Sequence, residues 1–140
     1  MPDYYDRTGR PVEMMEWASL FGTPDYKHVA YTEVTSASDP AVKYRVSTVW
    51  LGINHNYLNG PPHIFETMVF ADTPDPERYR GVFEPDPAWM DMLCRRYSNE
   101  LDAKLGHQET VILVAATVPD EVISTEYQTP APPPGAGTTA

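Results

Sequence analysis

The sequence has 140 residues, with ten basic side chains, twenty acidic ones, fifteen prolines and one cysteine. This length suits a single domain built around one core. The formal charge of −10 disfavours direct binding to nucleic acid or to an anionic membrane surface, because such binding depends on clustered lysines and arginines. With a lone Cys94 and no signal-peptide pattern, a reducing cytoplasm is the expected location.

The first expected elements are a brief strand at residues 4–5 and a short amphipathic helix that ends at Gly22. Apolar residues repeat with helical spacing at Met14, Trp17 and Phe21. Residues 29–34 predict an edge strand. Residues 44–53 and 64–70 are rich in β-branched and aromatic side chains, so they predict a hairpin, with Trp50 in the core.

Two further elements are expected after the hairpin. Residues 89–97 predict a strand, and residues 99–116 predict a longer helix, although residues 111–114 also suit a strand. Asn99 is a suitable helix cap, with Asp102 at capping-box spacing. An apolar stripe on this helix is formed by Leu101, Leu105 and Ile112.

This order predicts an α+β domain over residues 1–118, with a three- or four-stranded antiparallel sheet, a short N-terminal helix and a longer helix after the last strand. Within it, residues 72–91 predict a proline-rich acidic loop, because six carboxylates stand there against two arginines. Residues 119–140 predict a flexible proline-rich tail, because the closing run has no large apolar side chain to bury.

The hairpin sequence carries a resemblance to known proteins. The runs are Val46-Ser-Thr-Val-Trp-Leu-Gly-Ile-Asn-His55, Gly60-Pro61-Pro62 and Ile64-Phe-Glu-Thr-Met-Val-Phe70, with Arg96-Tyr97-Ser98 and Gly106-His107 further on. Together they resemble a family of small proteins of actinobacterial phages and prophages, for which no chemistry is established. The sequence departs from that family's pattern at His63 and at Ile53-Asn54. The resemblance implies a phage or prophage accessory protein.

His55 and His63 flank the hairpin loop and are weak candidates for zinc ligands. A third ligand would have to come from Glu66, Cys94 or His107. The spacing matches no recognised metal site, and hydrogen bonding within the loop explains His55 and its neighbour Asn56 equally well. His107 is expected to be a packed or surface histidine, so no metal and no cofactor are predicted.

Glu66 is an acid that shares one side of its predicted strand with Ile64, Met68 and Phe70. An ion pair with Arg45 or Arg96 that fixes the sheet register is the favoured interpretation, and a catalytic acid or ligand contact is the second. The opposite side of the strand is nearly as apolar, so Glu66 facing solvent remains a third.

Cys94 precedes two arginines that would lower its thiol pKa, but a small buried residue is the favoured interpretation. No nucleotide-binding loop, nucleophile elbow or catalytic constellation is present in the sequence, so no enzymatic activity is predicted.

The expected function is therefore binding to a host or phage protein in the host cytoplasm. The alternative is a virion component, such as a capsid or tail decoration protein, and an oligomer is compatible with both. Candidate binding residues lie in the hairpin, on its second strand and in the acidic loop: His55, Asn56, Tyr57, Glu66, Asp75, Glu77, Glu84 and Asp86.

Overall fold

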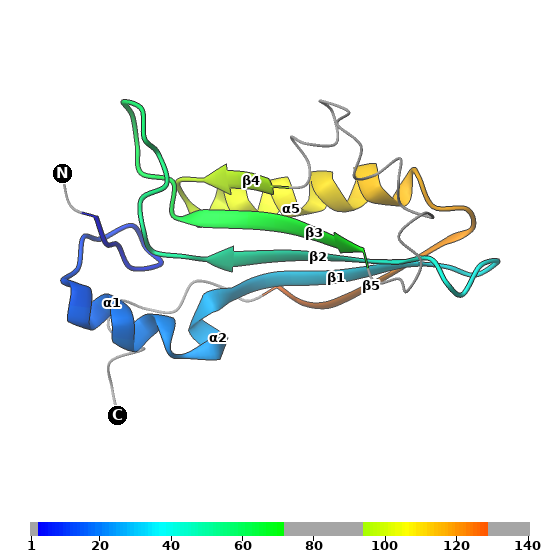
Figure 1. The fold of residues 1–140 in the computed structure, drawn as a ribbon, viewed down its shortest axis with the longest axis horizontal. Helices are drawn as coiled ribbons and strands as arrows, with labels where there is room; N and C mark the ends of the chain where they lie inside the picture. The colour runs from blue at the N-terminus through cyan, green and yellow to red at the C-terminus, as the bar shows by residue number, and fades with distance from the viewer. Residues whose placement is uncertain (1–2, 72–93, 129–140) are drawn as a thin grey trace.

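A computed structural model describes residues 3–71 and 94–128 and shows an antiparallel sheet with one long helix across a face and two short helices at one end (Figure 1). The five strands lie in the order β4-β3-β2-β1-β5. In chain order, the elements are α1 (Met14–Phe21), α2 (Pro24–Lys27), β1 (His28–Ser36), β2 (Lys43–Trp50), β3 (Phe65–Ala71), β4 (Cys94–Tyr97), α5 (Glu100–Ala115) and β5 (Glu121–Gln128). Within the described ranges, no helix is long and apolar enough to cross a bilayer.

The α+β class is confirmed, but the expected count of three or four strands is wrong. The additional strand is β5, which lies in the region expected to be a tail from residue 119. It pairs antiparallel with β1, so β1 lies between β2 and β5 and is not an edge strand. The long helix therefore precedes the last strand, and residues 129–140 lie outside the described residues.

The predicted hairpin is present as β2 and β3, in which Trp50 lies opposite Phe65 and both side chains are buried. The brief N-terminal strand is reduced to two isolated bridges, from Tyr4 to Ile53 and from Tyr5 to Pro11. β4 corresponds to the last part of the strand expected over residues 89–97, of which residues 89–93 are outside the described ranges.

The helix expected over residues 99–116 is present as α5, and a strand over residues 111–114 is excluded. The Asn99 side chain accepts a hydrogen bond of 2.8 Å from the Asp102 N–H, so the expected cap is confirmed.

The expected apolar stripe of α5 faces solvent. Its three residues have exposed fractions of 68%, 49% and 67% at Leu101, Leu105 and Ile112. The buried face of α5 is formed largely by small and polar residues, among them Ala103, Gly106, His107 and Thr110. The sheet explains why these residues are small or polar, because it presents threonine hydroxyls and the Tyr97 ring to the helix.

The N-terminal turn is attached to the sheet and to α5 through Arg7, whose side chain is buried. Its Nε pairs with the Glu100 carboxylate, and its Nη1 donates to the Tyr26 carbonyl at 3.1 Å. The Tyr26 hydroxyl in turn accepts a hydrogen bond of 2.7 Å from the Arg7 N–H. A buried guanidinium needs such compensation, so this contact places the start of α5 next to the α2–β1 junction.

Gly106 allows α5 to approach β4 closely. A Cβ atom at this position would overlap the ring and hydroxyl of Tyr97, which is buried beneath the helix. We expect Gly106→Ala to lower the free energy of unfolding by about 1–3 kcal/mol, because the overlap forces the helix or the ring to move. Urea unfolding followed by circular dichroism measures this loss.

Tyr97→Phe is the matched control, because the Tyr97 hydroxyl is buried and has no hydrogen-bond partner in the described part of the chain. Its removal should leave the free energy of unfolding unchanged or raise it. Equal stability of the Gly106→Ala variant and the parent would contradict the packing described for α5.

Candidate functional site

The loop between β2 and β3, residues 51–64, projects from one end of the sheet on the side opposite α1 (Figure 1). Gly52 lies near the start of the loop, where its φ of +74° suits glycine and its Cα lies against the Trp17 and Trp50 rings. The Trp17 Nε1–H donates to the Leu51 carbonyl at 2.9 Å. The base of the loop is therefore held by the aromatic core.

Two asparagines brace the upper part of this loop. The Asn54 side-chain oxygen Oδ1 accepts from the backbone N–H groups of Asn56 at 2.8 Å and His63 at 3.1 Å. The Asn56 side chain donates to the Pro61 carbonyl at 2.8 Å and accepts from the Leu58 N–H at 3.0 Å. These bonds satisfy backbone groups that a projecting loop would otherwise leave to water, so they fix its shape.

The braced loop presents Tyr57 and Leu58 at its tip, where their exposed fractions are 84% and 85%. An aromatic and an aliphatic side chain fully displayed on an ordered loop form a typical anchor for a protein partner. The sequence predicted Tyr57 as a candidate contact residue. It missed Leu58, although a leucine between two asparagines of a loop is a recognisable signal.

His55 and His63 face each other across the loop through their backbones, with the His55 N–H donating to the His63 carbonyl at 2.9 Å. The described residues contain no cluster of three or more histidine, cysteine, aspartate or glutamate side chains placed to hold a metal ion. Of the third ligands considered, His107 lies beneath α5 and bonds to threonines. His55 and Asn56 are thus loop residues beside the exposed Tyr57.

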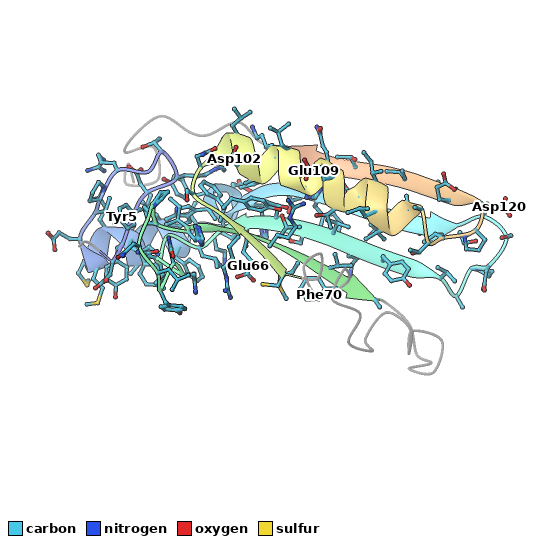
Figure 2. The ribbon with its side chains drawn as sticks, turned by 90° about the horizontal axis from the view of Figure 1, so that it is seen from above. Tyr5, Glu66, Phe70, Asp102, Glu109 and Asp120 are labelled. Carbon is cyan, nitrogen blue, oxygen red and sulfur yellow. The ribbon has the colours of Figure 1, made fainter. Side chains whose placement is uncertain are left out.

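Glu66 lies on the outer face of β3, the face turned away from α5 (Figure 2). The apolar side of this strand is formed by Phe65, Thr67 and Val69, so the expectation that Glu66 shares an apolar face is wrong. Arg96 lies directly opposite in the β3–β4 register, and its Nε is 3.3 Å from the Glu66 carboxylate. This cross-strand pair matches the favoured interpretation, a contact that supports sheet register.

Cys94 is exposed, so the expectation of a buried residue is wrong. Partial desolvation and the nearby Glu66 carboxylate raise the pKa of the Cys94 thiol, and the opposing effect of Arg96 is smaller. An activated thiolate requires the opposite shift. The four acidic candidates of the 72–91 loop, Asp75, Glu77, Glu84 and Asp86, lie outside the described residues.

A second feature that the sequence did not reveal lies beneath α5, where His107 joins a chain of threonine side chains. The Thr32 Oγ1 is 2.9 Å from His107 Nε2, and the Thr48 Oγ1 is 2.7 Å from Nδ1. Thr48 also bonds to Thr67 at 2.6 Å, and Thr32 to Thr125 at 3.2 Å. The chain thus crosses β5, β1, β2 and β3, with the imidazole in the middle.

Burial lowers the pKa of the His107 imidazole from 6.5 to about 4. The ring is therefore neutral at physiological pH, and one of its nitrogens donates while the other accepts. One end of the threonine chain opens at the surface, in a groove of about 330 Å³ between α5 and β5. Its lining residues are Thr32, His107, Gln108, Val111, Ile112 and Thr125.

Comparisons of the chain with protein-family models, with curated proteins and with solved structures found no match.

The loop bracing predicts a local effect of Asn56→Ala. The variant loses the hydrogen bonds to the Pro61 carbonyl and from the Leu58 N–H. We expect hydrogen exchange at the Leu58 amide to accelerate by about tenfold, while the free energy of unfolding falls by no more than about 1 kcal/mol. Amide exchange measured by NMR reports the change. Asn59→Ala in the same loop is the control, and equal acceleration in both variants would contradict a specific role for Asn56.

The buried imidazole predicts acid sensitivity. The folded state has the lower pKa, so His107 favours folding above pH 6.5, and this contribution is lost as the pH falls towards 4. Between pH 7 and pH 5, we expect His107 to account for a loss of about 2 kcal/mol in the free energy of unfolding.

Urea unfolding of the parent and of His107→Gln at both pH values isolates the contribution of His107 to the pH dependence of the free energy of unfolding, because the two proteins share all other titrating groups. An imidazole that titrates near pH 6.5 in NMR spectra of the folded protein would contradict the assignment.

Proposed function

We propose that this protein binds another protein through the tip of the 51–64 loop and acts by that binding without catalysis. The main observation behind this proposal is that Tyr57 and Leu58, two large side chains, are almost fully exposed on a loop whose shape is held by hydrogen bonds. Fixing the loop before binding lowers the ordering cost at the interface, so more of the contact energy contributes to affinity.

The chemistry of the loop indicates what kind of partner surface it fits. Residues 51–64 contain no aspartate, glutamate, lysine or arginine, although the whole chain has a formal charge of −10. A side chain such as Tyr57 inserts most favourably into an apolar pocket that satisfies its hydroxyl at the far end. The proposed partner therefore offers an apolar pocket with a hydrogen-bonding group, and its net charge has little direct effect at the tip.

The resemblance to actinobacterial phage and prophage proteins supports a setting for this binding. In that setting, the protein is an accessory factor in the host cytoplasm whose partner is a host or phage protein. The virion alternative assigns the same tip to a capsid or tail subunit. Mass spectrometry of purified virions distinguishes the two, because only a virion component is present at a fixed ratio to the capsid protein.

A double variant tests the tip. Tyr57→Ser with Leu58→Ser should weaken binding to the captured and purified partner by at least about 100-fold in calorimetry, because anchor residues dominate interface energies. The matched control is Met14→Ser with Met15→Ser, which removes two exposed apolar side chains from α1. Unchanged affinity of the tip variant, or equal losses in both variants, would contradict the proposal.

A further inference from the structure

Within residues 3–71 and 94–128, α5 is the one helix that lies across the inner face of the sheet, and this face is wider than the helix (Figure 1). Strand axes lie about 4.8 Å apart and a helix is about 10 Å across, so one helix covers roughly half of five strands. α5 lies obliquely over the middle strands, and β5 runs along the edge of the sheet beside it (Figure 2).

The uncovered part of this face is apolar where a second helix would lie. Ile123 on β5 pairs with Val34 on β1, so both side chains are on the α5 side of the sheet. Val34 is fully buried under α5, whereas Ile123 has an exposed fraction of 49%. Ile112 of α5, which lines the groove, is also exposed.

The exposed residues of α5 have the spacing of a helix-packing seam. Leu101, Leu105, Gln108 and Ile112 follow one another at intervals of four, three and four residues, so they form one line along the helix. Gln108 and Ile112 line the groove directly. The side of α5 next to the groove therefore has the residue spacing of a helix that packs against another helix.

Charge determines which kind of helix fits. Residues 100–128, which form α5, β5 and their connection, contain six carboxylates and one lysine. Two of the six are already in ion pairs, Glu100 with Arg7 and Glu109 with Arg95. Asp102 lies near the start of α5 and Asp120 at the turn into β5, so acids stand at both ends of the helix (Figure 2). An approaching positive segment is attracted to this region, and a second copy of the same surface is repelled.

We propose that the groove between α5 and β5 binds a cationic amphipathic helix of a partner protein. Its apolar side packs on Ile112 and Ile123, and its lysines and arginines face Asp102 at one end of α5 and Asp120 and Glu121 at the other. This surface is separate from the loop tip of the proposed function, so one protein could engage a partner at two places or two partners at once.

Designed peptides test this proposal on the full chain. The first peptide has about 18 residues, to match the length of α5, with a leucine stripe and flanking lysines and arginines. The second carries the same stripe with glutamates in place of the basic residues. We expect the cationic peptide to bind at least about tenfold more tightly in fluorescence anisotropy, with amide shifts centred on Ile112, Ile123 and Thr125.

Uncharged variants separate the groove from general charge attraction. The groove variant, Ile112→Gln with Ile123→Gln, should bind the cationic peptide about tenfold more weakly than the parent. Met15→Gln, at an exposed apolar residue of α1, should leave the affinity unchanged. The proposal would be overturned if both peptides bound equally well, if the groove variant bound the cationic peptide as tightly as the parent, or if the amide shifts were centred elsewhere.

Two further measurements test for other occupants of the groove. Self-association of the parent that Ile112→Gln with Ile123→Gln abolishes, seen in sedimentation velocity, would assign the groove to a second copy. Shifts at the groove on deletion of residues 129–140, without peptide, would assign it to the chain itself. Either result overturns the cationic helix, and neither affects the Tyr57 and Leu58 test of the loop tip.

Discussion

The hydrogen-bonded imidazole of His107 fixes where the only long helix in the described part of the chain lies. Its two nitrogens contact hydroxyls on neighbouring strands, Thr32 of β1 and Thr48 of β2, so α5 cannot slide across the sheet without breaking one of the bonds. Thr67 and Thr125 extend the same chain to the strands on either side. A buried polar chain in which each group has a partner specifies one arrangement more strictly than apolar packing alone.

The position of α5 explains the two unusual surfaces next to it. Because the packed face of the helix is devoted to His107 and to small residues that fit Tyr97, its larger apolar residues point outwards. Because the helix is held over β1 and β2, it leaves the inner face of β5 exposed, and no other element of the described residues covers that face. The groove and the exposed stripe are thus consequences of one contact.

Much of the fold could be predicted from local patterns, because they report local physics. The capping geometry at Asn99, the β2–β3 hairpin and the burial of Trp50 each depend on neighbouring residues or on a large apolar side chain. The orientation of α5 could not be predicted from its apolar residues, since the helix packs on hydroxyls supplied by strands far away in sequence. β5 was missed because a proline-rich run follows it, although residues 121–128 include the β-branched or aromatic residues Val122, Ile123, Thr125 and Tyr127.

The candidate site divides in the same way. Tyr57 and Asn56 could be identified because loop chemistry is readable from sequence, whereas the groove joins α5 to a strand that had not been expected. Most of the formal charge of −10 comes from two segments of the chain. Residues 72–91 carry six acids and two arginines, and residues 100–128 carry six acids and one lysine, so all other residues together have a net charge of only −1. The two proposed surfaces therefore differ in chemistry: the loop, which has no acidic or basic side chain, would select a partner by shape and apolar contact, and the acidic α5–β5 region would select one by long-range charge.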